Sequence, residues 1–313
     1  MIPTREQELA VLRSVVYASL FDYPLEPAQL ESSLIGVGGP AAAIERWWRE
    51  SDLLQATIEY RDGFYFPAGR SDLVGTRSRR EALSRELLER DRRILSLVAN
   101  MPFVRMVALS GSLAHLNAEG SADLDLFVIT APHRVWSVTV ATLVLAKLLG
   151  WRKRLCMNYV LSEQALTIEP PDLFSANQIV HLRPLGGTGV FARFLEANPF
   201  VKSFYPNFEG PETSSAGTAG LQARNALLER VLSLGIAQAA ERVARSLYGW
   251  HLRRHSATWT SSDQVKLEPE CLKLHTSSHR ASTLARFDAA MAEILAREPA
   301  CAASPVTAAV GRR

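Results

Sequence analysis

The sequence predicts an α+β protein with a small mixed β-sheet, an N-terminal unit of three short helices and a hairpin, and a helical C-terminal region. Three observations support this prediction. Apolar residues recur at helical spacing through most of residues 6–99 and again after residue 220. Short apolar runs typical of strands are concentrated in the middle of the chain. An Asp-Gly pair between two aromatic-rich runs indicates a hairpin at residues 62–63.

The N-terminal unit is expected to span residues 1–75. Three helices followed by a two-stranded ribbon resemble a winged helix, whose third helix often enters the major groove of DNA. Here that helix offers only Arg46 and Arg49 against two glutamates, which is weak for neutralising phosphates. A scaffold or partner-docking role is therefore favoured over DNA binding. The predicted elements are helices at 6–20, 26–34 and 40–53 and strands at 56–60 and 64–66.

A long charged helix from Arg77 to Ala99 is predicted to link this unit to the core, so residues 76–101 are assigned as a linker helix. Pro102 ends it because proline has no N–H to donate. The remaining divisions are a core at 102–208, a flexible linker at 209–220 rich in Pro, Gly, Ser and Thr, and a helical region at 221–313 with a frayed tail beyond Arg297. The core is expected to contain strands at 106–109, 124–129, 155–161 and 165–168 and helical segments at 135–149, 173–181 and 191–197.

Composition limits the class of protein. The chain has 313 residues, 47% of them apolar and 21% charged, which suffices for two or three hydrophobic cores in a soluble protein. Its formal net charge of +3 predicts no strong field for nucleic acid, although 77–80 and 152–154 are basic. Three cysteines without paired spacing favour reduced thiols, and no secretory signal is evident, so a cytoplasmic location is expected. The longest apolar stretch, 135–149, is too short for a bilayer and contains Lys147, so no membrane association is expected.

The most informative motif is Ser110-Gly111-Ser112 followed by Asp123-Leu124-Asp125. Successive strand side chains point to opposite faces, so Asp123 and Asp125 are expected to share one face. Two carboxylates on one edge of a sheet suit Mg²⁺ (or Mn²⁺), which takes its other ligands from water and phosphate. Gly111 has no Cβ and would let a polyphosphate approach the backbone N–H groups and the serine hydroxyls of the turn.

Gly-Ser, a ten-residue spacer and Asp-x-Asp on a following strand resemble the DNA polymerase β-like nucleotidyltransferase superfamily. The resemblance implies a nucleotidyltransferase core in which an acceptor attacks the α-phosphorus of a nucleoside triphosphate, with ATP the first choice. Pyrophosphate leaves while metal ions bind the reacting oxygens. By their positions, two basic residues are further expected to steady the pyrophosphate. The expected metal ligands and catalytic acids are Asp123 and Asp125, and the expected nucleotide-binding residues are Ser110, Gly111, Ser112, Arg105 and Lys153.

The superfamily commonly carries a third acid on a later strand, and this chain departs from that pattern. Asn158 lies in the middle of the predicted strand 155–161, where the carboxylate is expected, and is assigned to the catalytic site beside the acceptor. An amide cannot readily take a proton from an attacking hydroxyl. Glu163 or Asp172 could replace the missing acid, although a solvated loop acid is the favoured interpretation of Glu163. The pattern is also consistent with an acceptor that needs no strong base and with a domain that has lost catalysis.

The remaining clusters carry less weight. The glycines at 186–189 lack the Gly-x-Gly-x-x-Gly spacing of a nucleotide-binding turn and predict a loop. The histidine pairs 251/255 and 275/279 have helical spacing but no third zinc ligand, so packed or solvated histidines are favoured. The basic residues of 273–280 would either close over a phosphate or form an ordinary basic surface. A wider resemblance, to bacterial uncharacterised nucleotidyltransferase-domain proteins with a winged-helix-like N-terminal region, is carried by 106–129, 156–159, 206–207, Lys273 and His275.

Two functions follow from these patterns. The leading one is a Mg²⁺-dependent nucleotidyltransferase that moves a nucleoside monophosphate from a triphosphate to a hydroxyl or amine of a small molecule or protein. The second is a catalytically degenerate nucleotide-sensing or regulatory protein whose winged-helix-like unit binds nucleic acid or a partner protein. A template-dependent polymerase is disfavoured because neither length nor charge provides a channel for a duplex.

Overall fold

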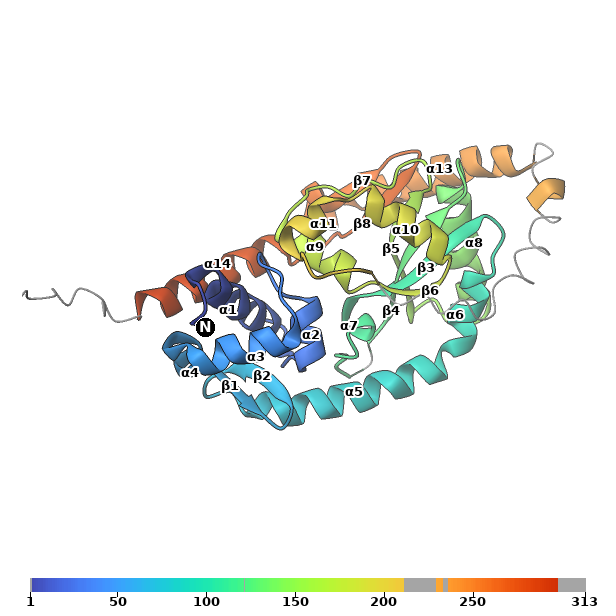
Figure 1. Ribbon diagram of the computed structural model, residues 1–313. Helices are drawn as coiled ribbons and strands as arrows, with labels where there is room; N and C mark the ends of the chain where they lie inside the picture. The colour runs from blue at the N-terminus through green and yellow to red at the C-terminus, as the bar shows by residue number, and fades with distance from the viewer. Residues whose placement is uncertain (1, 121, 211–228, 233–235, 298–313) are drawn as a thin grey trace, which may run out of the picture.

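The computed structural model describes residues 2–120, 122–210, 229–232 and 236–297 and shows an α+β protein. Its strands form a two-stranded hairpin and a six-stranded mixed sheet (Figure 1). The hairpin belongs to the N-terminal part of the chain, and helices pack on both faces of the larger sheet. The predicted α+β class is therefore confirmed.

The N-terminal unit consists of α1 (Arg5–Ser19), α2 (Pro27–Ser32), α3 (Ala41–Glu50), α4 (Asp52–Thr57), β1 (Ile58–Arg61) and β2 (Phe64–Pro67). Thr4 caps α1: its hydroxyl accepts a hydrogen bond from Gln7 N, while the Gln7 side chain accepts one from Thr4 N. Ser51 ends α3 and caps α4 by accepting a hydrogen bond from Leu54 N. The predicted third helix is therefore two helices, and the predicted strand start at residue 56 is wrong because α4 continues to Thr57.

Two helices, α5 (Asp72–Arg90) and α6 (Arg92–Ala99), replace the single helix predicted between the N-terminal unit and the sheet. The break lies at Asp91, which is 2% exposed and forms ion pairs with Arg90 at 2.5 Å and with Arg154. A buried carboxylate needs such compensation, and here it comes from two arginines. In Figure 1, α5 extends from the hairpin along the lower side of the molecule to α6.

The strands of the six-stranded sheet are β3 (Val104–Ser110), β4 (Leu124–Thr130), β5 (Leu155–Ser162), β6 (Arg183–Gly186), β7 (Val265–Leu267) and β8 (Cys271–Leu274). Their order is β6-β3-β4-β5-β8-β7. β4 and β5 are parallel, and the other neighbouring pairs in this sheet are antiparallel. The parallel pair needs a crossover, which α8 (Val135–Leu148) supplies.

The remaining described helices are α7 (Gly111–Ala114), α9 (Leu173–Val180), α10 (Thr188–Glu196), α11 (Phe200–Phe204), α13 (Ile236–Arg254) and α14 (Arg280–Ala296), with short 3-10 turns at Ser256–Thr258 and Ser262–Gln264. Alternation along the strands divides the sheet between two cores. Phe127 and Ile129 pack on one face with residues of α1, α9, α10 and α14. Leu126 and Val128 pack on the opposite face with residues of α5, α6, α8 and α13. α14 also packs against α1, so late and early parts of the chain lie side by side (Figure 1).

Several sequence predictions about the core are confirmed. The strands expected at 106–109, 124–129 and 155–161 correspond to β3, β4 and β5, and the helices expected at 135–149 and 173–181 correspond to α8 and α9. The predicted helical segment at 191–197 corresponds to α10. Among the helices that the structure describes, none is long and apolar enough to cross a membrane. The predicted tail beyond residue 297 and nearly all of the predicted linker at 209–220 lie outside the described residues.

Three predictions about the sheet are wrong. Residues 165–168 form no strand, because the Asn198 side chain binds their backbone instead: Ile168 N donates to Asn198 Oδ1 at 2.8 Å, and Asn198 Nδ2 donates to Leu166 O at 2.8 Å. The loop predicted at 186–189 is wrong at both ends, because Gly186 ends the edge strand β6 and Thr188 begins α10. The C-terminal region is not purely helical, because β7 and β8 extend the sheet beside β5.

Candidate functional site

The acidic pair lies at the start of β4. Leu124 and Leu126 are fully buried in one core, while Asp125 is on the opposite face and lines a cavity. Asp123 immediately precedes the strand and is exposed. Cys156 is paired with Asp125 across the parallel strands, and its Sγ lies 3.8 Å from Asp123 Oδ2. The two carboxylates are therefore neighbours, one facing the cavity and one facing solvent.

Asn158 binds Asp125 directly. Its Nδ2 donates to Asp125 Oδ1 at 2.6 Å. Met157 pairs with Leu126 and Tyr159 pairs with Phe127, so Asn158 is an extra residue, a bulge in β5. Burial raises the pKa of the Asp125 carboxyl to about 6; the hydrogen bond from Asn158 opposes this rise, and the negative charge of Asp123 adds to it.

The Ser-Gly-Ser turn packs against the same carboxylate. Ser110 pairs with Asp125 across the strands, and its hydroxyl donates to Asp125 O at 3.2 Å. Gly111 has φ = +66°, in the left-handed region. A Cβ at residue 111 would lie only 2.5 Å from Asp125 Oδ2, well inside van der Waals contact. The turn therefore needs glycine both for its backbone conformation and for the space beside Asp125.

A cavity of about 550 Å³ opens beside this turn. Most of its wall comes from α1 with the segment after it, the turn at the start of α7, α9, and the connection from β8 to α14, and the residues that follow α2 and α11 complete it. Its floor includes Asp125 and Phe127 of β4 and Asn158 and Tyr159 of β5. Of the described residues that line it, none is Lys, Arg or Glu, and Asp125 is the one carboxylate. Asp125 therefore faces no lysine or arginine in the described part of the cavity wall.

Histidines form part of this wall. The rings of His115 and His181 lie 4.0 Å apart between centroids, and His275 packs edge-on against Tyr159. Burial lowers the pKa of His115 well below its usual range, with His181 and then Arg77 adding to the effect. Burial also lowers the pKa of His181, and it lowers that of His275 to about 4 with Lys273 contributing. These three rings are neutral at physiological pH.

A pH-dependent stability follows from His275. Because its pKa is depressed from 6.5 to about 4, its contribution to stability is present above pH 6.5 and is lost as the pH falls toward 4. We expect acidification from pH 7 to 4.5 to lower the free energy of unfolding by about 2 kcal/mol through this residue. His275→Gln should flatten the dependence, measured by chemical denaturation across that range. His251→Gln, at an exposed position on α13, is the matched control; parallel curves for wild type and His275→Gln would contradict the assignment.

The structure brings five predicted site residues to the cavity: Ser110, Gly111, Ser112, Asp125 and Asn158. Asp123 is adjacent to it on the exposed side.

The two predicted pyrophosphate-binding residues lie elsewhere. Arg105 is near the start of β3, at the opposite end from Ser110, where it binds Glu229 through two contacts of 2.9 and 2.8 Å. Lys153 is exposed in the turn before β5 and does not line the cavity. Lys153 is nevertheless on the Asp123 side of the sheet, since Leu124 N donates to the carbonyl of the neighbouring Arg154 at 2.8 Å.

Neither candidate for the third acid faces Asp125 across the cavity. Glu163 forms an ion pair with Arg193 at 2.9 Å, beyond the far end of β5. Asp172 caps α9 by accepting from Ser175 N at 2.8 Å and forms an ion pair with Arg280 at 2.5 Å. Among the described residues, no group of three or more His, Cys, Asp or Glu is placed to hold a metal ion.

The basic segment at 273–280 is divided between different partners. Lys273 is buried and donates to Gln264 Oε1 at 3.0 Å, and Arg280 is paired with Asp172. His275 and His279 line the cavity. The four side chains therefore do not converge on one phosphate.

Sequence reasoning missed the aromatic and histidine walls. Tyr17, His115 and His181 come from α1, the end of α7 and the end of α9. No short motif links these positions, because the contacts that join them are long-range.

Comparison with known proteins does not assign this site. No family model matches the chain. No curated protein and no solved structure matches it either.

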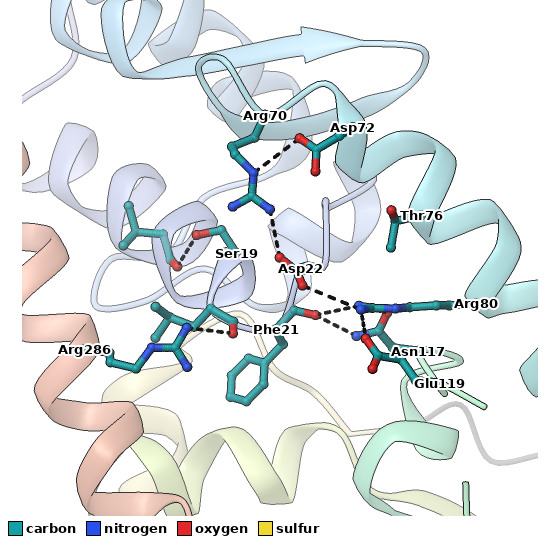
Figure 2. Close-up of polar contacts among 12 residues, drawn as sticks. Ser19, Phe21, Asp22, Arg70, Asp72, Thr76, Arg80, Asn117, Glu119 and Arg286 are labelled. Carbon is teal, nitrogen blue, oxygen red and sulfur yellow. Dashed lines mark hydrogen bonds and ion pairs between the residues drawn. The ribbon is translucent and has the colours of Figure 1, made fainter. Parts of the chain in front are cut away.

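A polar junction fixes the wall between α1 and the α7 turn (Figure 2). Arg80 of α5 donates to Phe21 O at 3.2 Å and forms ion pairs with Asp22, at 3.6 Å, and with Glu119. Asn117 Nδ2 also donates to Phe21 O, at 2.8 Å. Phe21 and Asn117 both line the cavity, so Arg80 holds together two segments of its wall.

Removing Arg80 should weaken this wall. We expect Arg80→Met to lower the free energy of unfolding by about 1–3 kcal/mol, because it leaves Phe21 O, Asp22 and Glu119 with one partner fewer. Arg79→Met on the same helix is the control, since Arg79 is exposed and bonds Thr76 one turn away. Thermal and urea unfolding measure both variants, and equal stabilities would contradict the role assigned to Arg80.

Proposed function

We propose that this protein is a Mg²⁺-dependent nucleotidyltransferase that moves a nucleoside monophosphate from a nucleoside triphosphate, with ATP the first candidate, to a hydroxyl or amine acceptor. The observation that carries the proposal is the contact between the Gly111 turn and Asp125, with Asp123 beside it, at the edge of a cavity. This Gly-Ser turn and this Asp-x-Asp pair also carry the chain's resemblance to the polymerase β-like superfamily.

The residues present fit a magnesium ion. Asp123 and Asp125 would hold it, because Mg²⁺ is commonly bound by one or two carboxylates plus phosphate and water. The space that a Cβ at residue 111 would fill lies directly against Asp125 Oδ2. When bound, the ion supplies positive charge that polarises the phosphoryl group and stabilises the leaving oxygen.

The chain's own groups would orient the reactants. Gly111 and Ser112 line the cavity where Gly111 is itself exposed, and the Ser112 hydroxyl and the backbone N–H groups of the turn would bind phosphate oxygens there. The acceptor oxygen forms a bond to the α-phosphorus, the bond from that phosphorus to the bridging oxygen breaks, and pyrophosphate leaves with the electron pair. The acceptor proton passes to water at the mouth of the cavity beside Asp125. Asn158, through its hydrogen bond, holds Asp125 in one orientation.

A direct assay tests this proposal. The purified protein is incubated with each of the common nucleoside triphosphates, Mg²⁺ and panels of alcohols, amines and proteins, and pyrophosphate release is measured. We expect release that requires both an acceptor and the metal and that stops on chelation. Absence of release across all triphosphates and acceptor classes would overturn the proposal.

A second candidate function is supported by the missing third carboxylate. With Asn158 where an acid is common in the superfamily, and with Glu163 and Asp172 occupied elsewhere, the domain would bind nucleotide without turnover. Its N-terminal unit, which we propose to be winged-helix-like, would then contact a partner protein or, less favoured by its charge, nucleic acid. Calorimetric titration with each triphosphate, with and without Mg²⁺, distinguishes the two: binding without turnover favours the sensor.

A further inference from the structure

We infer that the cavity binds the acceptor as a neutral, mainly apolar alcohol whose hydroxyl lies at Asp125, while the triphosphate approaches from the exposed side of Asp123. This inference rests on the proposed function and narrows its acceptor class. It assigns the two reactants to opposite sides of the acidic pair.

The charge of the cavity wall supports a neutral acceptor. Beyond the glycine turn, which the proposed function assigns to the phosphates, the described lining residues include no Lys, Arg or Glu, so apart from Asp125 none of these charged side chains would compensate a charged ligand. Burying an unpaired charge is costly, and a charged acceptor would lose its hydration without gaining a partner. An ammonium group would find Asp125 alone, and the proposed metal competes for that carboxylate. A hydroxyl acceptor therefore fits better than an amine.

The aromatic residues indicate the shape and character of the ligand. Tyr17, Phe21 and Tyr23 approach the cavity from the N-terminal unit, and Phe127 and Tyr159 from the sheet. A volume of about 550 Å³ is within the range of cavities that enclose small organic molecules. Serine, asparagine and neutral histidine side chains between the aromatic residues supply uncharged polar contacts.

Tyr17 provides an independent sign that a ligand group is accommodated. The residue is 2% exposed, and its hydroxyl has no hydrogen-bond partner among the described residues. A buried hydroxyl without a partner is costly, and Tyr17 lines the cavity, so a ligand oxygen toward which the ring turns would recover a lost hydrogen bond. Its pKa is raised, chiefly by burial, so the group is a neutral donor.

The opposite side of the acidic pair suits a triphosphate. Asp123 is exposed, and Arg152 and Lys153 are exposed in the turn before β5. Arg152 is close enough to lower the pKa of Cys156, against the larger opposing effects of burial and of the two aspartates. Arg152 and Lys153 lie near this edge of the sheet, whereas the described cavity wall contains no Lys or Arg. The cationic side would therefore bind the triphosphate, and the cavity would bind the acceptor.

Binding is tested without nucleotide, first without metal and then with Mg²⁺. Three probes share one ring system: naphthylmethanol is neutral, naphthoate is anionic and naphthylmethylammonium is cationic. By ligand-detected NMR titration we expect the alcohol to bind at least about tenfold more tightly than naphthoate. Any binding of the ammonium to Asp125 should be lost when Mg²⁺ is added, while that of the alcohol remains. Equal or tighter binding of naphthoate, or of the ammonium in the presence of Mg²⁺, would overturn the inference.

Tyr17→Phe tests the position of the ligand. It should weaken binding of naphthylmethanol by about three- to tenfold while leaving the melting temperature of the free protein unchanged or higher, since it removes an unsatisfied hydroxyl. A merely structural tyrosine would not show this opposite pair of effects. Tyr60→Phe, in the hairpin and 42% exposed, is the matched control. Equal affinities of the wild type and Tyr17→Phe would overturn the placement in this cavity.

A turnover assay separates this inference from the proposed function. Pyrophosphate release with MgATP is measured with the three probes as acceptors, beside the wider acceptor panel. Release stimulated by naphthylmethanol alone among the probes supports both. Turnover of charged acceptors without binding of the alcohol contradicts the inference and leaves the proposed function standing. Binding of the alcohol without turnover of any acceptor contradicts the proposed function, and with it the role of the ligand as acceptor.

Discussion

Asp125→Asn is expected to abolish nucleotidyl transfer while leaving the fold intact. The amide cannot supply the negative charge that the proposed Mg²⁺ requires, so we expect a loss of roughly a thousandfold or more in rate, equivalent to about 4 kcal/mol. An Asn at residue 125 can still accept the hydrogen bond from Asn158. Pyrophosphate release and circular dichroism measure the two effects.

Without metal, the same substitution is expected to stabilise the protein although it abolishes activity. Because the pKa of Asp125 is raised to about 6, its contribution to stability is fully present below its ordinary pKa of 3.8 and is lost as the pH rises through 6. Asp125→Asn should therefore raise the free energy of unfolding at pH 7.5 in chelator by up to about 2 kcal/mol relative to the wild type. That gain should disappear near pH 4.

Asp288→Asn, at an exposed position on α14, is the control for both measurements. Wild-type turnover by Asp125→Asn would refute the assigned role. A large loss of stability in the same variant would show that the carboxylate serves the fold instead.

Gly111→Ala is expected to reduce both activity and stability. The new Cβ would lie 2.5 Å from Asp125 Oδ2, and the left-handed backbone at φ = +66° adds a further cost for any residue with a side chain. Relief of the clash must move the turn or the carboxylate. We expect about 2–4 kcal/mol of destabilisation and a loss of activity on the order of a hundredfold, since small misplacements of reacting groups have large effects.

Gly63→Ala separates the two causes. Gly63 also has a left-handed backbone, with φ = +87°, but a Cβ there would meet nothing within 4 Å. Gly63→Ala should lower the free energy of unfolding by about 1 kcal/mol and leave activity unchanged. If both alanine variants behave alike in unfolding and in pyrophosphate release, the close approach of Gly111 to Asp125 has no functional importance.

The sequence predicted the parts of the fold that rest on local patterns. β3 and β4 could be located because each contains a continuous run of apolar residues. The Ser-Gly-Ser turn marks the end of β3, and the acidic pair marks the start of β4. β6 could not, because Pro184 argues against a strand in the middle of a sheet, and β6 is tolerated at the edge. β7 and β8 are short and carry Lys266 and Lys273, so their pairing with β5 depends on tertiary contacts that no local pattern contains.

The candidate site divides in the same way. Asp125 and Gly111 could be predicted as neighbours because they lie at facing ends of adjacent strands. The hydrogen bond from Asn158 depends on a bulge in β5, which shifts one residue out of register and has no clear sequence signature. The walls of the cavity depend on how α1, α9 and the β8–α14 connection meet around the sheet, and this packing cannot be inferred from spacing along the chain.

The composition of the cavity wall also affects how the protein folds during its synthesis. Tyr17 comes from the first helix, and His275 and His279 come from the connection that precedes the last described one. A nascent chain can form its early helices and most of the sheet while synthesis continues, but this enclosure must wait until the connection from β8 to α14 has emerged from the ribosome. The cavity wall would therefore be complete only after residues 274–279 have been synthesised, and a chain cut short before residue 274 would retain the acidic pair without this part of the wall.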